Sequence, residues 1–363
     1  MQALRNTWYA AVWSTELEQK LLQRTLLGES IVFYRNRAGR AFALANMCPH
    51  RFAPLHLGKL IEDTVECGYH GLRFNSAGKC VFNPDGDRLT PASAVVRSYP
   101  IQERYGLIWI WMGNPDVAAP ELLPRFPFLE TPQVYRPVTG YLRVNTNYRN
   151  MIDNLLDVAH VLIVHHDMLA CPGLALAKTK VVREGAAIWA NRLATNTEPP
   201  VIFDMMWRRA RGDYAEPMDH WAESRWDAPS LISQNTGIAL TGRPREEGFE
   251  TKNAHFTTPE TETSTHYFWA ISRNFDIQNA KLDEEIYNGT EYAFVHQDQP
   301  ILEGLQQIVG DREFWSMKPA LLQGDVGAVE VRRALDRLIE DERSVSESAR
   351  RAVSNVGSTV EKL

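Results

Sequence analysis

The chain has 363 residues, which exceeds the usual size of a single domain and suggests two domains. Hydrophobic residues make up 44% and charged residues 23%, which are ordinary globular values and argue against a disordered protein. The net charge of −6 argues against a dedicated nucleic-acid binder, because such proteins carry a basic excess. No apolar run approaches a membrane span, no secretory signal pattern opens the chain, and four cysteines are too few for a disulfide scaffold. The composition therefore predicts a cytoplasmic protein with no membrane or nucleic-acid partner.

The first part of the chain consists of short apolar or alternating runs separated by turn signals, a pattern typical of β-strands. No segment before Pro115 keeps a helical period for three turns, so an all-β domain is predicted over residues 1–115. The clearest expected strands cover residues 31–34, 41–45, 72–74 and 107–112.

A proline-rich stretch follows and predicts an extended connection over residues 116–137. Proline is excluded from helix interiors and central strands, and this stretch and its margins contain six: Pro115, Pro120, Pro124, Pro127, Pro132 and Pro137. The remaining residues, 138–363, are predicted to form a second domain with both helices and strands. Its expected parts are a helix over 150–166, a strand-rich region over 175–275 with its clearest strand at 265–271, and helices at 329–338 and 340–353. The predicted fold class is therefore α+β.

Two cysteines and two histidines in the first domain form the first chemical motif. Cys48 and His50 make a C-x-H pair, and Cys67 and His70 follow as C-x-x-H. Structural zinc is an alternative, but zinc modules more often pair cysteine with cysteine and histidine with histidine. One thiolate and one imidazole from each loop suit a Rieske [2Fe–2S] cluster, in which one iron takes both thiolates and the other both imidazoles. Because neutral imidazoles replace thiolates, the cluster potential rises and favours electron transfer.

The second motif lies in the predicted helix over 150–166. His160 and His165 are five residues apart, about 140° around an ideal helix, so the helix must end or widen between them if both bind one metal. Two histidines and one carboxylate form the ligand set of mononuclear non-haem Fe(II). Asp298 is the preferred distant carboxylate and Glu303 the alternative, and spacing alone does not decide between them.

Asp157 lies three residues before His160, which would place both on one helix face. Its carboxylate is either an ordinary surface charge or a hydrogen-bond acceptor that orients a ligand imidazole. Asn154 and Asp153 lie beside it and would extend such a polar network.

These motifs resemble the oxygenase component of Rieske non-haem iron oxygenases. The segments CPHR, CGYHG and NLLDVAH-x₄-H carry the resemblance, together with Asp298 downstream. RNTWYAA, CPHRFAPL, RSYPIQERYGLIWIWMGNP, TPETETSTHYFWAISRNF and DVGAVEVRRALDRLIEDE are similar to the aromatic O-demethylase branch, which includes the vanillate O-demethylase and dicamba monooxygenase types. The resemblance spans nearly the whole chain.

The resemblance implies two cofactors and a defined assembly. Cys48, His50, Cys67 and His70 would hold the Rieske cluster, and His160, His165 and Asp298 the Fe(II). It also implies a helix-grip catalytic domain, in which an antiparallel sheet packs on helices. The expected assembly is a homotrimer in which His70 of one subunit approaches Asp157 of its neighbour. The expected electron donor is a separate NAD(P)H-dependent reductase with flavin and a plant-type iron–sulfur cluster.

The implied reaction is O-demethylation of a methoxylated, vanillate-like aromatic acid with O₂, releasing formaldehyde. The alternative within this class is hydroxylation of a methyl or ring carbon of an aromatic acid or aryl sulfonate. His255 stands where dicamba monooxygenase has a substrate-contacting histidine, and an ordinary strand histidine is the alternative. Gln234 or Asn235 falls near another polar pocket position. A Rieske ferredoxin or a zinc-stabilised binding protein would leave the second domain and the His160/His165 pair unexplained. Cys80 and Cys171 are expected to be ordinary buried thiols.

Overall fold

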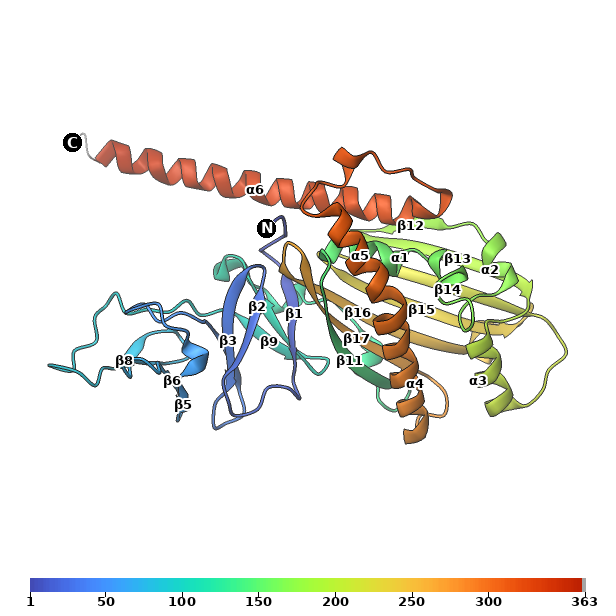
Figure 1. Ribbon diagram of the computed structural model, residues 1–363, viewed down its shortest axis with the longest axis horizontal. Helices are drawn as coiled ribbons and strands as arrows, with labels where there is room; N and C mark the ends of the chain where they lie inside the picture. Colours follow the sequence, from blue (N-terminus) through green and yellow to red (C-terminus); the bar gives the residue numbers. More distant parts are fainter. Residues whose placement is uncertain (361–363) are drawn as a thin grey trace.

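The computed structural model describes residues 1–360 and shows a β-rich N-terminal part beside a large sheet with helices (Figure 1). Three small antiparallel sheets form the N-terminal part. The first has the order β1-β10-β9, the second β2-β3-β4, and the third β5-β6-β7-β8. Their bounds are β1 Trp8–Trp13, β2 Leu22–Leu26, β3 Glu29–Arg35, β4 Ala41–Ala45, β5 Lys59–Ile61, β6 Thr64–Glu66, β7 Arg73–Phe74, β8 Cys80–Phe82, β9 Ile101–Arg104 and β10 Leu107–Trp111, with the short 3₁₀ helix η1 at Leu55–Leu57.

Strand β1 is buried on both faces, because it lies between the two parts of the molecule. Tyr9 and Ala11 pack into the core of the N-terminal domain. Trp8 and Ala10 alternate with them and pack into a second core that includes Phe256 of the large sheet. The run WYAAVW is therefore apolar throughout rather than alternating.

The proline-rich connection forms short 3₁₀ helices instead of the extended segment that its composition predicts. These are η2 Pro115–Val117, η3 Pro120–Leu122 and η4 Pro127–Leu129, and each has proline at its start. Proline is tolerated there because the first helical N–H has no partner within the helix. Leu123, Phe126 and Phe128 point from the connection into the core shared with the large sheet.

The second part is built on a seven-stranded antiparallel sheet in the order β11-β17-β16-β15-β14-β13-β12. Its strands are β11 Arg136–Val144, β12 Lys180–Glu184, β13 Ala187–Thr197, β14 Met218–Asp227, β15 Leu231–Leu240, β16 Phe249–Thr261 and β17 Ser264–Arg273. The helices are α1 Tyr148–Leu156, α2 Pro172–Leu176, α3 Val201–Arg211, α4 Ala280–Tyr292, α5 Gln299–Val309 and α6 Val326–Val360, with 3₁₀ helices η5 His160–Leu162, η6 Arg245–Glu247, η8 Trp315–Met317 and η9 Gln323–Asp325 and the π-helix η7 Ala293–Asp298. The α+β fold class is confirmed.

The two faces of this sheet have different neighbours, and this difference positions the site. Residues such as Gln234 and His255 lie on the face that contacts α1 and η7, which we call the helix-covered face. Phe256 and Phe268 form a register pair on the opposite face and pack against the N-terminal domain. Successive side chains along each strand point alternately to these two faces, as the pleat of a β-strand requires.

Two further details differ from the sequence prediction. The helix expected over 150–166 ends at Leu156, and the strand-rich region contains the helix α3. In contrast, the expected C-terminal helices are present as one long helix, α6. None of the helices in residues 1–360 has the length and hydropathy needed to span a bilayer.

Candidate metal centres

The predicted cluster ligands lie on two loops that share one backbone hydrogen-bond pattern. In the first loop, the N–H of Cys48 donates to the Ala53 carbonyl at 2.9 Å, and the N–H of Phe52 donates to the Cys48 carbonyl at 2.9 Å. The second loop repeats both bonds around Cys67, at 2.8 and 3.0 Å. The fourth residue after each cysteine has a left-handed backbone, with φ of 59° at Phe52 and 72° at Gly71. The two loops are thus structural equivalents, although their sequences differ.

The cysteine thiols of these loops are buried in the N-terminal domain, and the histidine imidazoles are exposed at its surface. Cys48 and Cys67 are each 2% exposed, whereas His50 and His70 are exposed and their ring centroids lie 4.6 Å apart. Burial, together with a smaller effect of the adjacent Cys67, raises the pKa of the Cys48 thiol to about 11. Two neighbouring buried thiolates therefore need the positive charge of bound metal. The four residues fit a cluster with both sulfur ligands on the inner iron and both nitrogen ligands on the outer one.

Close packing holds the second loop against helix η1. A Cβ atom at Gly68 would lie 2.9 Å from the Leu57 carbonyl oxygen, so a larger residue there would push the two segments apart. The glycine that follows Cys67 is therefore required by the approach of the backbone.

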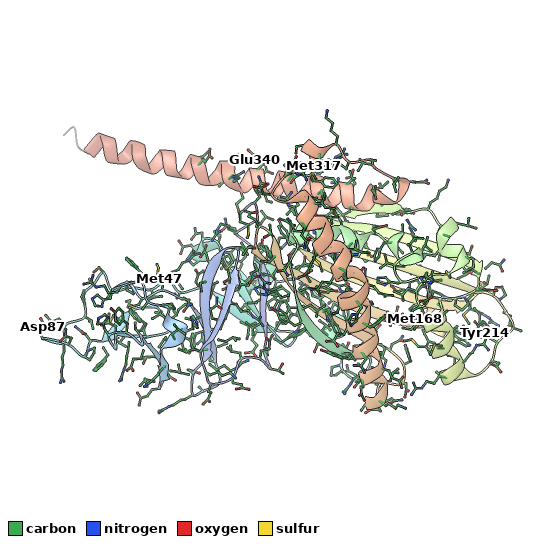
Figure 2. The ribbon with its side chains drawn as sticks, viewed as in Figure 1. Met47, Asp87, Met168, Tyr214, Met317 and Glu340 are labelled. Carbon is green, nitrogen blue, oxygen red and sulfur yellow. The ribbon has the colours of Figure 1, made fainter. Side chains whose placement is uncertain are left out.

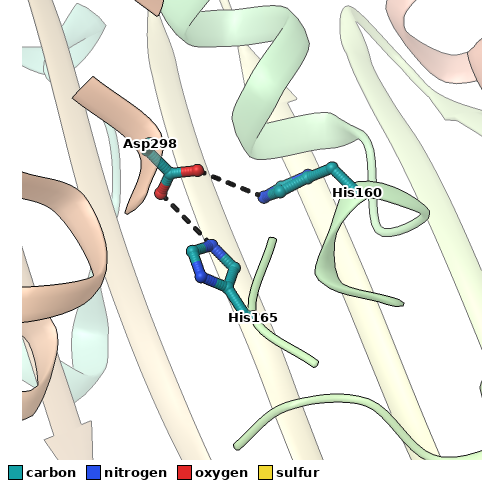
Figure 3. Close-up of side chains that lie close together, drawn as sticks. All are labelled: His160, His165 and Asp298. Atoms are coloured by element: carbon teal, nitrogen blue, oxygen red, sulfur yellow. Dashed lines mark ion pairs between the residues drawn. The ribbon is translucent and has the colours of Figure 1, made fainter. Parts of the chain in front are cut away.

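His160, His165 and Asp298 converge on one point beneath the helix-covered face (Figure 3). Nε2 of His160 lies 3.6 Å from Asp298 Oδ1, and Nε2 of His165 lies 3.3 Å from Asp298 Oδ2. Their ligand atoms all lie within 4.8 Å of one another. Asp298 is only 3% exposed, so its charge calls for cationic partners. Two imidazoles and one carboxylate with this spacing fit a mononuclear iron and leave coordination positions for other ligands.

Each imidazole is oriented by a hydrogen bond at its other nitrogen. Nδ1 of His160 contacts the backbone carbonyl of Asp157, and Nδ1 of His165 lies 2.7 Å from the Gln297 side-chain oxygen. Both acceptors require a protonated Nδ1, which leaves the lone pair of Nε2 directed toward Asp298 and the metal position. This arrangement supports metal ligation by both histidines.

The histidines meet because α1 ends before either of them. Asp157 is the C-terminal cap of α1, and its Oδ1 accepts the N–H of Ala159 at 2.7 Å. His160 then opens the 3₁₀ helix η5, and turns lead to His165. The helix therefore ends, one of the two alternatives that the spacing allows.

The three-residue spacing suggests that Asp157 and His160 lie on one helix face. They do not, because the helix ends before both residues. The backbone carbonyl of Asp157 accepts the imidazole N–H, and its carboxylate oxygen Oδ2 lies 4.0 Å from Nδ1 of His160. The carboxylate of Asp157 is partly exposed and remains available to a group outside this chain's own iron site.

The π-helix η7 presents the distant carboxylate. It joins α4 to α5 and places Gln297 and Asp298 so that both contact the histidines. Pro300 in the first turn of α5 has no N–H to donate to the preceding turn, which favours the wider π geometry. Glu303, the alternative carboxylate, instead accepts hydrogen bonds from Asn145 and Gln299, away from both histidines.

Hydrogen bonds and burial set the charge at the iron site. Asn154 donates to Asp298 Oδ1 at 3.1 Å, as a polar network extending from Asp157 would predict. Burial alone would lower the pKa of His165, but its hydrogen bond to Asp298 and the carboxylate charge outweigh burial and raise that pKa. Asp153 faces away and pairs with Arg332 of α6 at 2.6 Å.

The three predicted substrate residues separate into two groups. Gln234 and His255 lie together on the helix-covered face, with Nε2 of His255 3.0 Å from Gln234 Oε1. Asn235 lies on the opposite face and accepts the indole N–H of Trp221 at 3.1 Å. The structure therefore brings Gln234, and not Asn235, to the side of the sheet that carries the iron ligands.

Gln297 is a site residue that the sequence analysis misses. Its place immediately before Asp298 in HQDQ was the available signal, but only the π-helix shows that both neighbours face inward. His166, which adjoins His165, and the other two cysteines contribute nothing to these centres. His166 is exposed and pairs with Asp167, Cys171 is buried as expected, and Cys80 is partly buried.

Two known domain families match the chain, and they follow one another in the order in which the two domains are predicted. Residues 7–100 match the Rieske [2Fe-2S] domain, and residues 144–341 match the vanillate O-demethylase oxygenase C-terminal domain. Both matches lie within the predicted domains, whose boundaries at 115 and 137 remain predictions.

Similar proteins align with this chain over nearly the whole length of both chains. The chain is 40% identical to the oxygenase component of chloroacetanilide N-alkylformylase from Rhizorhabdus wittichii, over 93% of this chain and 96% of the relative. It is 35% identical to the iron–sulfur subunit of a toluene-4-sulfonate monooxygenase system from Comamonas testosteroni, over 93% and 98% of the respective chains. The crystal structure of dicamba monooxygenase bound to dicamba superposes with a TM-score of 0.87 at 36% identity, covering 94% of this chain and 98% of that one. Dicamba O-demethylase is from Stenotrophomonas maltophilia.

Proposed function

Because the chain belongs to the Rieske non-haem iron oxygenases with a catalytic domain of the vanillate O-demethylase type, we propose that it O-demethylates a methoxylated aromatic compound and releases formaldehyde. The chain is an oxygenase component and a monooxygenase that uses a Rieske [2Fe–2S] cluster and a mononuclear iron. The observation that carries the proposal is the convergence of His160, His165 and Asp298 on one buried point.

The bound iron supplies the O₂ chemistry, and the residues of this chain hold and shape its surroundings. We assign His160, His165 and Asp298 as its ligands, and Cys48, His50, Cys67 and His70 as the cluster ligands. The Asp157 carbonyl and Gln297 fix the imidazole tautomers, and Asn154 fixes one carboxylate oxygen. Burial of Asp298 shields this ligand carboxylate from bulk water.

Electron delivery requires a second copy of the chain in this proposal. The cluster loops and the iron site lie far apart along the molecule: Figure 2 labels Met47, beside Cys48, and Met168, just after His165, in the two separate parts. The exposed His70 and the partly exposed Asp157 are the groups that would meet between neighbouring subunits. Exposed apolar side chains surround the cluster loops and suit burial in such an interface: Met47, Phe52, Leu57 and Tyr69.

A cyclic assembly would connect every cluster to a neighbouring iron, and we propose a homotrimer. An NAD(P)H-dependent reductase with flavin and a plant-type iron–sulfur cluster would supply the electrons. The description of the relatives as oxygenase components implies a separate reductase.

A second reaction has a specific observation in its favour. A relative with 35% identity is named as part of a toluene-4-sulfonate monooxygenase system, so hydroxylation of a methyl or ring carbon is the alternative. The resemblance to vanillate enzymes also predicts a carboxylate on the aromatic ring.

Product analysis separates the two reactions. The purified oxygenase is incubated with a surrogate reductase, NADH and a panel of methoxylated and methylated aromatic compounds. O-demethylation gives formaldehyde and a phenol in step with NADH consumption. A hydroxylated product without formaldehyde would replace demethylation by the alternative, and a panel with no oxygenated product would refute both.

A further inference from the structure

Arg192 on β13 is a buried cation without a carboxylate partner. Its side chain lies on the helix-covered face, and the residue is only 7% exposed. Nε donates to the hydroxyl of Thr179 at 2.9 Å, and neither terminal nitrogen has a hydrogen-bond or ion-pair partner among the described residues. Charged groups that are buried this deeply are ordinarily paired with the opposite charge. A guanidinium held only by a neutral hydroxyl therefore indicates a negative group close by.

The segment at the beginning of α6 brings Arg192 to Asp157. A Cβ atom at Gly327 would lie 2.6 Å from Cβ of Ala190, so α6 begins in close contact with β13, two residues before Arg192. Gly324 precedes this contact in η9. A Cβ atom there would lie 3.1 Å from Nη2 of Arg192 and 3.7 Å from Oδ1 of Asp157. The guanidinium and the carboxylate thus approach the same point beside Gly324.

The other charged groups around the start of α6 already have partners. The carboxylate of Asp325 accepts the N–H of Leu322 at 2.6 Å and so closes the turn of η9. No lysine or arginine of the described chain forms an ion pair with Asp157. Asp157 is therefore the acid that Arg192 has available. Two further pairs complete the region: Arg183 with Glu330, and Arg332 with Asp153 at 2.6 Å.

An anionic group on the substrate is a different partner, and the direction of the side chain argues against it. Arg192 shares a cross-strand row with Ala222 and Thr236 of the helix-covered face. Its guanidinium does not extend along this row toward the middle of the sheet. It contacts Thr179, which directly precedes the edge strand β12, and lies beside Gly324. The cation is thus directed toward the margin of the sheet and toward Asp157.

Asp157 is hydrated in the single chain and would lose water in the proposed assembly. Its side chain is 29% exposed, and Oδ1 accepts the N–H of Ala159 at 2.7 Å. A neighbouring subunit whose His70 meets Asp157 would cover this carboxylate. Taking a carboxylate out of water costs free energy unless a cation compensates its charge. Arg192 is already buried, so covering the carboxylate removes little further water from the guanidinium.

From this arrangement we propose that Arg192 compensates the charge of Asp157 where a neighbouring subunit covers that carboxylate. The inference rests on the proposed function, because it requires the assembly in which Asp157 meets a cluster loop of another copy. Thr179 holds the guanidinium beside Gly324 before the subunits meet, so the cation is in place when the carboxylate loses water. Arg192 acts through Asp157 and is therefore a positioning residue for electron transfer.

Subunit association tests the compensation without any measurement of activity. Sedimentation velocity of the holoenzyme over a dilution series gives the concentration at which the assembly dissociates. Arg192→Met should raise this concentration by about tenfold, because it leaves one uncompensated carboxylate in each interface. Arg192→Lys keeps a cation and should retain most of the association. Arg183→Met is the matched control, since Arg183 also contacts the start of α6 but pairs with Glu330. Equal weakening by the control would overturn the inference.

A double-mutant cycle assigns the effect to Asp157. In an Asp157→Asn background there is no carboxylate charge to compensate, so Arg192→Met should no longer weaken association. Weakening of equal size in both backgrounds would contradict the role of Arg192 toward Asp157. If Arg192→Met does not fold, Thr179→Val replaces it. That variant removes the acceptor of the Arg192 Nε–H and should weaken association only while Asp157 carries its charge.

The outcomes separate this inference from the proposed function. A holoenzyme that stays monomeric at every concentration would refute the proposed assembly and this inference together. An assembly that Arg192→Met leaves unchanged would refute the inference alone. In single-turnover measurements at a concentration where the variant is assembled, Arg192→Met should slow electron transfer from cluster to iron by about tenfold, with both metals retained. Unchanged electron transfer there would contradict the positioning role.

Discussion

The two metal centres of this chain are built in opposite ways. The proposed cluster ligands come from two short loops with equivalent hydrogen bonds, and each loop supplies one thiol and one imidazole. The proposed iron ligands come from a loop after α1 and from a π-helix more than a hundred residues later. The cluster imidazoles are exposed, whereas Asp298 is almost fully buried.

The difference reflects what each centre must do. A cluster that exchanges electrons with other proteins benefits from outward-facing ligands, while an iron that reacts with O₂ needs a site from which water is excluded. Turns within each loop are enough to position the ligands of the cluster. The second depends on the packing of α1, α4 and α5 over one sheet, so it should be the more sensitive to substitutions that act through neighbours.

Loss of an iron ligand should break one centre and spare the other. His160→Ala should reduce turnover by more than about a hundredfold, because the remaining two ligands hold iron poorly. The absorbance and electron paramagnetic resonance spectra of the cluster should be unchanged, because its ligands lie in the other domain. A cluster lost together with the activity would show that the two centres are not independent.

The link between the centres is tested at Asp157. Asp157→Asn keeps the side-chain oxygen that accepts the Ala159 N–H but removes the charge. Single-turnover measurements should show electron transfer from cluster to iron slowed by up to about a hundredfold, with both metals still bound. Asp167→Asn is the control, since this exposed acid lies in the same loop and should have no effect. Near-normal electron transfer in Asp157→Asn would refute its proposed bridging role.

The dependence of the iron site on its neighbours is tested at Gln297. Gln297→Leu removes the acceptor that orients His165, and iron affinity should fall by about 10- to 100-fold. Fe(II) retention during dialysis against a graded chelator measures this change. Gln307→Leu, on an exposed position of α5, serves as the control. Equal retention by both variants would mean that His165 needs no such support.

The smallest expected effect is on the pH dependence of iron binding. Protons and iron compete for Nε2 of His165, and Asp298 raises the pKa of this imidazole above its usual 6.5. Proton competition should therefore begin at a higher pH than for an ordinary histidine. Below the raised pKa, Fe(II) affinity should fall by about tenfold per pH unit for this one proton. An affinity that stays constant down to pH 6 would contradict the raised pKa.

Much of the fold follows from local patterns in the sequence. The expected strand at 41–45 is β4, residue for residue, and the alternating and apolar runs of the first domain are strands as predicted. The proline-rich segment forms 3₁₀ turns that its composition does not predict, because Leu123, Phe126 and Phe128 fold it onto a core shared with the large sheet. The helix over 150–166 was predicted too long, since helix-forming residues continue past the point where Asp157 caps α1.

The sequence by itself determined the chemistry of the two metal centres. Residue type and local spacing are enough to propose the two C/H pairs and the two closely spaced histidines as ligands. Asp298 is preferred over Glu303 only because of the resemblance, which spans nearly the whole chain. Only the tertiary structure decided what surrounds those ligands. Gln297 faces His165 because of a π-helix, Asp298 is nearer the histidines than Glu303, and Gln234, unlike Asn235, lies on their side of the sheet. These choices depend on register and helix packing between distant segments, which local sequence patterns do not specify.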